Sequence, residues 1–181
     1  MLSAWDVLAD NTRLGRSVAM IGGGAVGLET AMFVADKGTI DPDTLHFLLT
    51  YEAQSVDRLK ELMFQGSTKV TVFEMLPKAG SDVGKSTRWV LFDNLKRYGV
   101  KIITGAKVTS IDQGAVTFQK NENEEKMNFD QVILASGSQS IQTISREVES
   151  LKTPFNIVGD CIRPGKINDA IHGGFLAAME I

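Results

Sequence analysis

The sequence predicts an α/β fold, in which a Rossmann-like parallel sheet carries helices on one face, with a small antiparallel meander and an inserted helical pair. Three observations predict this class. An unbroken apolar run at Ser17–Ile21, typical of a parallel strand covered on both faces, leads into a glycine cluster and then a helical pattern. Apolar strand patterns then alternate with helical ones, as in βαβ units. From Lys107 to Phe129 the pattern changes to short β segments separated by turn residues.

Composition and charge exclude several classes of protein. Of the 181 residues, 43% are hydrophobic and 23% charged, and the formal net charge is -3, which predicts no basic surface for nucleic acid or an anionic membrane. No run of about 18 apolar residues could span a bilayer, and Asp6 and Asp10 interrupt any signal-peptide pattern. The single cysteine, Cys161, cannot form an internal disulfide. We therefore expect a cytoplasmic protein with no nucleic-acid or membrane partner.

The glycines form a G-x-G-x-x-G pattern between a strand and a helix. Gly22 permits the tight turn, Gly24 lets a pyrophosphate approach the backbone, and Gly27 lets the helix pack closely on the strand. The phosphates then lie on the free N–H groups where the helix begins, at Ala25 and Val26, and the helix dipole favours their charge. The pattern and its context predict a turn that binds NAD(H).

The first elements flank this turn. Leu2–Leu8 is interpreted as a short docking helix that delivers the chain to the first strand. The helix after the glycines is expected over Ala25–Lys37, with Gly38 ending it.

Residues 39–66 delay the second strand and are interpreted as an inserted helical pair. Two helical patterns span Asp43–Glu52 and Ser55–Phe64. Their apolar faces exceed what one side of a small sheet needs. We therefore expect three of their residues to cover a sheet edge or to dock another domain: Phe47, Leu48 and Leu62.

The second strand is expected over Lys69–Met75, which places Glu74 at its carboxyl end. In a dinucleotide fold this is the position of an acid that accepts hydrogen bonds from both ribose hydroxyls, and its charge opposes a 2′-phosphate. The alternative is an acid that merely ends a strand. The upstream glycine turn favours the ribose role, and so NADH.

A helix follows over Ser86–Tyr98, with Ser86 as its N-cap and Gly99 ending it. Its aromatic residues are expected in the core rather than against a cofactor: Trp89, Phe92 and Tyr98. Val100–Ile103 supplies the next strand.

Three short segments then predict an antiparallel meander: Val108–Asp112, Ala115–Gln119 and Lys126–Phe129. The acidic residues before the third segment are interpreted as a solvated hairpin tip, and no cluster has metal-ligand spacing: Glu122, Glu124 and Glu125. The chain returns to the parallel sheet at Asp130–Leu134. The last segment, Phe155–Asp160, is interpreted as a strand that ends at Asp160, and a helix that runs to Ile181 follows it.

These motifs occur in a fixed order, from the glycine turn and the acid-ended strand through the meander to D-Q-V-I-L-A-S-G and N-I-V-G-D before a helix. That order resembles the two-dinucleotide flavoprotein reductases, the glutathione-reductase-like superfamily, over nearly the whole chain. Within it, the V-T-V-F-E-M-L-P-K and S-T-R-W-V-L segments look most like the C-terminal part of the NADH:flavin oxidoreductases, the group of 2-enoate reductase, 2,4-dienoyl-CoA reductase and trimethylamine dehydrogenase.

The resemblance implies roles for further residues. Glu29 matches an acid near the nicotinamide and the flavin, although it could equally be a half-buried helix carboxylate. Asp160, after Gly159, matches the acid that holds the ribityl or pyrophosphate region of FAD, and otherwise reads as an N-cap. The following helix, near Ala170 and Ile171, would offer N–H groups to the flavin.

Residues 1–140 would then be an NAD(H)-binding domain, and 141–181 the C-terminal segment of an FAD-binding domain. Gly137, in the A-S-G segment, matches a cofactor contact, and Ser136 stands where the family usually has Thr. Only one glycine turn is present, so the chain holds half of an FAD site. The resemblance implies that its partners are an N-terminal barrel and the first half of the FAD domain of the same parent. It also implies FMN and an iron–sulfur cluster in that parent. The cluster needs four cysteines, so the lone Cys161 of this chain cannot hold it.

The expected function is the NADH-binding portion of a flavin-dependent oxidoreductase that passes hydride from NADH to FAD, inactive as an isolated chain. The alternative is a non-catalytic sensor or regulatory module that binds NADH. No residue is assigned a catalytic or metal-binding role. His46 is expected to be structural, and His172 to lie near the flavin without acting as an acid or base.

Overall fold

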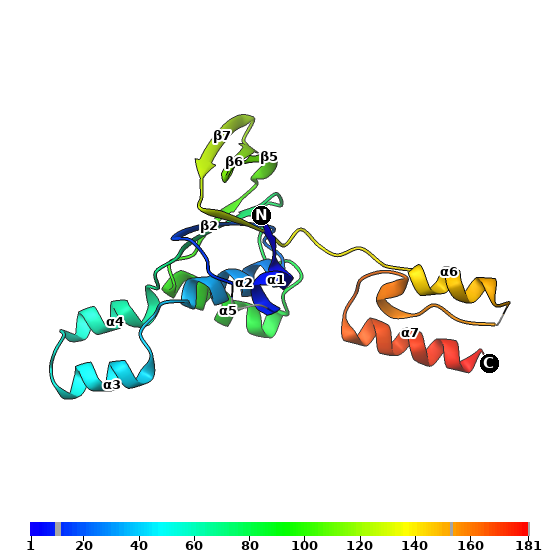
Figure 1. Ribbon diagram of the computed structural model, residues 1–181, viewed down its shortest axis with the longest axis horizontal. Coiled ribbons are helices and arrows are strands. Elements are labelled where there is room, and N and C mark those ends of the chain that lie inside the picture. The colour runs from blue at the N-terminus through cyan, green and yellow to red at the C-terminus, as the bar shows by residue number, and fades with distance from the viewer. Residues whose placement is uncertain (10–11, 153, 181) are drawn as a thin grey trace. The chain divides into compact units, whose positions relative to one another are not determined.

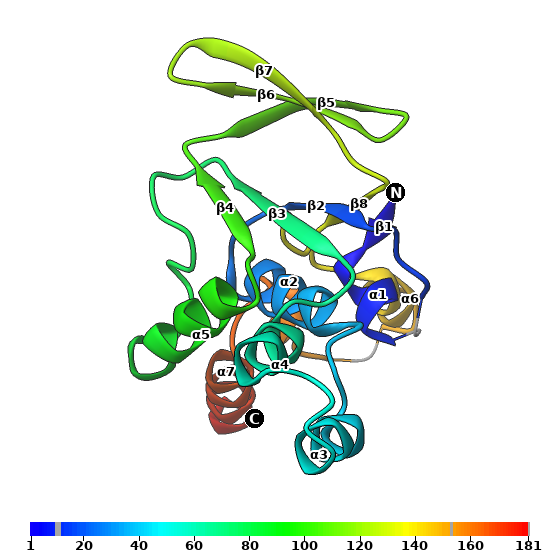
Figure 2. The same ribbon diagram turned by 90° about the vertical axis from the view of Figure 1, so that its left-hand side faces the viewer.

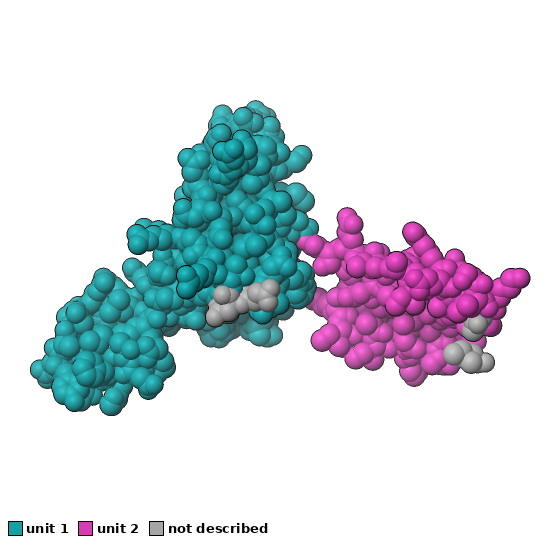
Figure 3. Space-filling model, viewed as in Figure 1, with its two compact units in different colours: residues 1–136 teal, residues 137–181 magenta. Residues whose placement is uncertain are grey.

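A computed structural model describes residues 1–9, 12–152 and 154–180. The chain divides into two compact units, residues 1–136 and 137–181 (Figure 3). This division lies four residues before the boundary predicted from the sequence. Each unit is described by itself below.

The first unit is built on a five-stranded parallel sheet with the strand order β1-β8-β2-β3-β4 (Figure 2). Its strands are β1 (Leu2–Ser3), β2 (Ser17–Ile21), β3 (Lys69–Glu74), β4 (Lys101–Thr104) and β8 (Gln131–Leu134). The glycine turn leaves the central strand, β2, between its parallel neighbours β3 and β8. Because the carboxyl ends of parallel strands share one edge, the ends of β2, β3 and β8 meet there.

Successive residues of the central strands pack on opposite faces of this sheet, as the two-residue period of a strand requires. Val18 and Met20 join a core with the helices α1 (Ala4–Ala9), α2 (Ala25–Asp36) and α5 (Lys85–Arg97). Ala19, between them, belongs to a second core with residues of the meander. The apolar run of β2 is therefore covered on both faces, and the predicted α/β class with helices on one face is confirmed.

The meander consists of β5 (Lys107–Asp112), β6 (Ala115–Lys120) and β7 (Asn123–Asn128). Phe118 of β6 is 1% exposed, and its ring centroid lies 4.9 Å from that of Phe73 in β3. The third segment begins three residues earlier than predicted. Only Glu122 lies in the hairpin turn, with φ +65°, because Glu124 and Glu125 pair with β6.

The inserted helices are α3 (Pro42–Thr50) and α4 (Val56–Phe64), as the sequence predicts (Figure 1). Asp41 and Ser55 cap them, accepting the N–H groups of Thr44 and Arg58. No residue of α3 is buried, and Phe47 is 55% exposed. Leu48 and Leu62 are half-buried. The prediction that Phe47 covers a sheet edge is therefore wrong. That these helices dock another domain stays a prediction.

Three local expectations differ from the structure in the first unit. Leu2 and Ser3, the first residues of the predicted helix, form β1 beside β8 instead, because long-range pairing overrides a weak local pattern. Helix α5 begins at Lys85 with Gly84 as its N-cap, so the predicted cap Ser86 lies inside the helix. Trp89, expected in the core, is 70% exposed on α5. Phe92 and Tyr98 are half-buried and pack against the core.

The second unit contains α6 (Thr143–Ser150), the short 3-10 turn η1 (Gly159–Cys161) and α7 (Ile167–Met179). The sequence interpretation missed α6, since T-I-S-R-E-V-E-S is short and mostly polar. Residues 155–158 form no strand, so Asp160 lies in a 3-10 turn rather than at a strand end. A strand needs a neighbour to pair with, and the described part of this unit contains none.

Candidate dinucleotide-binding site

The glycine turn has the geometry that its spacing predicts at Gly22 and Gly27. Gly22 has φ +110°, and a Cβ there would overlap the backbone oxygen of Ala135. A Cβ on Gly27 would overlap the backbone oxygen of Gly22, where α2 crosses the end of β2. Both positions therefore require glycine, one for its conformation and the other for the close approach of helix and strand.

The start of α2 presents backbone donors. Gly24 is its N-cap and offers no side-chain acceptor, so the first N–H groups need partners from elsewhere. Ala25 is half-buried and Val26 is 38% exposed. The N–H of Ala25 is hydrogen-bonded to both carboxylate oxygens of Asp82, each 3.0 Å away.

Glu74 ends β3, and its carboxylate lies against the turn. The residue is 9% exposed. Its Oε2 accepts the N–H of Gly23 over 2.7 Å, and its Oε1 accepts the N–H of Leu76 over 2.8 Å. A carboxylate has about four acceptor positions, so both oxygens keep capacity for further donors. A Cβ on Gly23 would lie 2.8 Å from the Cβ of Glu74. Glu74 can therefore pack against the turn only because residue 23 has no side chain.

The structure thus brings together the predicted turn residues and Glu74, at the shared carboxyl edge of β2 and β3. Glu29 lies one turn along α2 and is exposed, not half-buried. Gly137, with φ +107°, belongs to the second unit. His46 is exposed on α3, so no packing role is seen for it, and His172 is exposed on α7.

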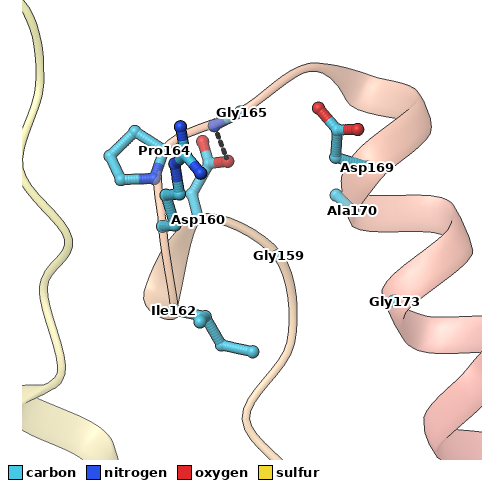
Figure 4. A pocket seen from close by; sticks show the side chains of 9 residues that line it. Gly159, Asp160, Ile162, Pro164, Gly165, Asp169, Ala170 and Gly173 are labelled. Carbon is cyan, nitrogen blue, oxygen red and sulfur yellow. Dashed lines mark hydrogen bonds between the residues drawn. The ribbon is translucent and has the colours of Figure 1, made fainter.

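The second unit holds a hollow of about 490 Å³. Figure 4 shows it between η1 and the start of α7, with Asp160 and Asp169 on its two sides. Asp160 Oδ1 accepts the N–H of Gly165 over 3.1 Å. The residues that line it are Gly159, Asp160, Ile162, Arg163, Pro164, Gly165, Asp169, Ala170 and Gly173. Of the cofactor residues expected in this unit, Gly159, Asp160 and Ala170 belong to this lining, whereas Gly137, Ile171 and His172 do not.

Sequence reasoning missed two groups of residues. Asp82 sits in a loop 57 positions from its partner Ala25, and S-D-V-G carries no local signal for that contact. Arg163 and Asp169 line the hollow, and the R-P-G turn and the acid three residues after Lys166 could have pointed to them.

Within residues 1–9, 12–152 and 154–180, no helix has the length and apolarity needed to cross a membrane. In the same ranges, His, Cys, Asp and Glu nowhere gather in threes as a metal site would need.

Comparison with known proteins gives relatives over nearly the whole chain. The chain is 37% identical over 180 residues to a metal reductase of Desulforamulus reducens, covering 99% of this chain and 27% of that protein. It is 30% identical over 179 residues to a bilirubin reductase of Mediterraneibacter gnavus, covering 98% of this chain and 23% of that protein. It is 28% identical over 185 residues to an NADH oxidase of Thermoanaerobacter brockii, covering 100% of this chain and 24% of that protein. The chain spans about a quarter of the length of these relatives.

Solved structures share the fold. A 2-naphthoyl-CoA reductase complex superposes with a TM-score of 0.72 at 20% identity, covering 99% of this chain and 23% of that one. A histamine dehydrogenase from Rhizobium sp. 4-9 superposes with a TM-score of 0.71 at 16% identity, covering 99% of this chain and 26% of that one.

The family described as pyridine nucleotide-disulphide oxidoreductase matches residues 4–154. This range includes the glycine turn, Glu74, the loop with Asp82 and the whole meander. Together with the oxidoreductase relatives, it supports a role in a flavin-dependent oxidoreductase. The chain belongs to the pyridine nucleotide-disulphide oxidoreductase family.

Proposed function

We propose that residues 1–136 bind NADH and that the chain serves a larger flavin-dependent oxidoreductase in which hydride passes from NADH to FAD. Glu74 carries the proposal. Its buried carboxylate is hydrogen-bonded to Gly23 inside the turn itself, so the acid for the ribose and the donors for the pyrophosphate form one site. This is the arrangement that a dinucleotide needs, because its ribose and pyrophosphate are adjacent.

The residues fit NADH better than NADPH. Gly24 places no side chain over the helix start, and the backbone at Ala25 and Val26 supplies the donors for phosphate oxygens. Glu74 keeps acceptor capacity for the 2′- and 3′-hydroxyls after its two backbone bonds. A 2′-phosphate would place up to two negative charges beside this carboxylate.

We propose that the second unit forms one side of an FAD site. Asp160, its neighbour Gly159 and the start of α7 at Ala170 face one hollow, which offers a carboxylate for hydroxyl donors beside a helix start. The cofactors supply the hydride chemistry when bound, and this chain binds and orients them. FMN, an iron–sulfur cluster and the substrate would be bound by other parts of an enoate-reductase-like parent, in keeping with relatives about four times as long.

The test is calorimetric titration of the chain with NADH and with NADPH. At about 4 Å and an effective dielectric of about 20, repulsion of a 2′-phosphate amounts to several kcal/mol, which relaxation and screening reduce to about 10- to 100-fold in affinity. We expect NADH to bind about 10- to 100-fold tighter than NADPH. Glu74→Gln should reduce this difference in affinity.

The control is Glu124→Gln, an exposed glutamate of β7, which should leave the ratio unchanged. Equal affinities of the unmutated chain for NADH and NADPH would contradict the role of Glu74. NADH binding by a full-length parent that never transfers its electrons to flavin would favour the sensor alternative.

A further inference from the structure

The loop between β3 and α5, residues 75–84, folds back onto the glycine turn. Gly80 donates its N–H to the backbone oxygen of Gly23 over 2.7 Å. Gly80 has φ +66°, and a Cβ there would lie 3.1 Å from Leu28 of α2 and 3.0 Å from Phe92 of α5. The loop is therefore fixed between the two helices, and the residues after Gly80 reach the start of α2.

Asp82 is the residue of this loop that contacts the start of α2. Both of its carboxylate oxygens accept the N–H of Ala25, each over 3.0 Å. A Cβ on Gly24 would lie 3.1 Å from Asp82 Oδ2, so the carboxylate lies directly over the second glycine of the turn. The N-cap Gly24 has no acceptor of its own, and Asp82 supplies the anion that a helix start favours.

The same glycine and the same N–H are the groups proposed above to receive the pyrophosphate of NADH. One N–H cannot donate fully to a carboxylate and to a phosphate at once, and the two anions repel each other at contact distance. Asp82 is exposed, so a rotation of its side chain into water is enough to release Ala25.

We propose that Asp82 is an internal anion that occupies the pyrophosphate-binding turn until a dinucleotide displaces it. The inference rests on the proposed function, because it requires that a dinucleotide binds at this turn. A ligand that gains only the turn contacts, such as inorganic pyrophosphate, competes with Asp82 on nearly equal terms. NADH also gains the ribose contacts with Glu74, so it displaces Asp82 at concentrations at which a simple anion does not.

The experiment replaces Asp82 by asparagine, which keeps the shape and an acceptor oxygen but removes the charge. We expect Asp82→Asn to bind NADH about 3- to 10-fold tighter by calorimetry, since it removes a favourable charge–helix interaction that the ligand must otherwise break. Inorganic pyrophosphate should gain at least as much. Asp112→Asn, which removes the same charge at the exposed end of β5, should leave both affinities unchanged.

A second readout follows the backbone amide of Ala25 by ¹⁵N NMR. In the free proteins its resonance should differ between the unmutated chain and Asp82→Asn; at NADH saturation the two should coincide, because Asp82 no longer contacts it. If Asp82→Asn does not fold, Asp82→Ser provides the neutral acceptor instead.

Unchanged or weaker NADH binding by Asp82→Asn, or Ala25 resonances that still differ at saturation, would overturn the inference and leave the proposed function standing. Absence of NADH binding in the unmutated chain and in every variant would instead overturn the proposed function, and this inference with it.

Discussion

At the residue scale, the glycine turn is held by contacts that allow no side chain at two positions. Gly22 has a left-handed backbone next to Ala135, and Gly27 brings α2 onto the backbone of Gly22. The N–H of Gly22 donates to the backbone oxygen of Phe73 over 2.9 Å, which ties the turn to β3. The turn is therefore fixed by its surroundings before any ligand binds.

Gly27→Ala is expected to destabilise the chain by about 1–3 kcal/mol, the usual range for overpacking. Alanine favours a helix interior by about 1 kcal/mol over glycine, but here its Cβ would overlap a backbone oxygen that cannot turn aside. The measurement is urea denaturation followed by circular dichroism.

The matched control is Gly84→Ala, at the N-cap of α5, where a Cβ would meet only Thr87 Oγ1 at an ordinary 3.6 Å. That change should cost less, about 0.5–1 kcal/mol, because glycine is preferred over alanine at an N-cap. Equal stability losses for the two variants would show that the close approach at Gly27 is unimportant.

At the element scale, the pairing of β2 with β8 is fixed where both strands begin. The N–H of Ser17 donates to Asp130 Oδ2 over 2.8 Å, and the N–H of Asp130 donates to the backbone oxygen of Ser17 over 3.0 Å. The backbone hydrogen bond from Ser17, and then the one from its hydroxyl, lower the pKa of Asp130 from its ordinary value of 3.8. These hydrogen bonds therefore favour the ionised form of Asp130.

Asp130→Asn should flatten the acid limb of the stability–pH profile. Because the folded-state pKa of Asp130 is lowered, its contribution is fully present above the unfolded-state pKa and is lost as the pH falls through the folded-state value. Urea midpoints from about pH 7 down to about pH 3 measure this. Asp112→Asn should keep the unmutated profile. A profile for Asp130→Asn as steep as the unmutated one would contradict the assignment.

At the scale of the whole molecule, the two units differ in how well they bury apolar surface. The first has two cores, one on each face of its sheet. In the second, no residue of α6 or α7 is buried, and Ile167, Ile171 and Met179 are 80%, 66% and 71% exposed. Exposed apolar faces of this extent usually mark interaction surfaces, which agrees with the proposal that this unit belongs to a larger FAD-binding domain.

The chain alone is expected to lose FAD during purification while it still binds NADH. Its residues would supply only one side of an FAD site, and Asp160 is exposed. Each charge-assisted hydrogen bond missing from the other side contributes about 1.5–3 kcal/mol, so the loss of three of them would weaken a nanomolar complex to between about micromolar and about millimolar. The visible absorbance of the purified chain after desalting measures this. A yellow preparation with stoichiometric flavin, or NADH oxidation by the chain without added domains, would show that it is not a partial FAD site.

The sequence by itself determined the α/β class, the glycine turn, the inserted helices and the place of Glu74 at the end of a strand. Each depends on local spacing: apolar residues at a strand or helix period, and glycines where a strand meets a helix. That Gly22 and Gly27 need glycine follows from this spacing, and the contacts around them agree.

Only the tertiary structure decided which distant groups meet. Asp82 reaches Ala25 across 57 positions, Leu2–Ser3 pairs with a strand some 130 residues later, and Trp89 points into solvent while Phe92 packs inward. The strand predicted to end at Asp160 is not formed. The physical reason is common to all four: a contact or a strand pairing depends on what the folded chain places opposite a residue, and local patterns carry no information about that partner.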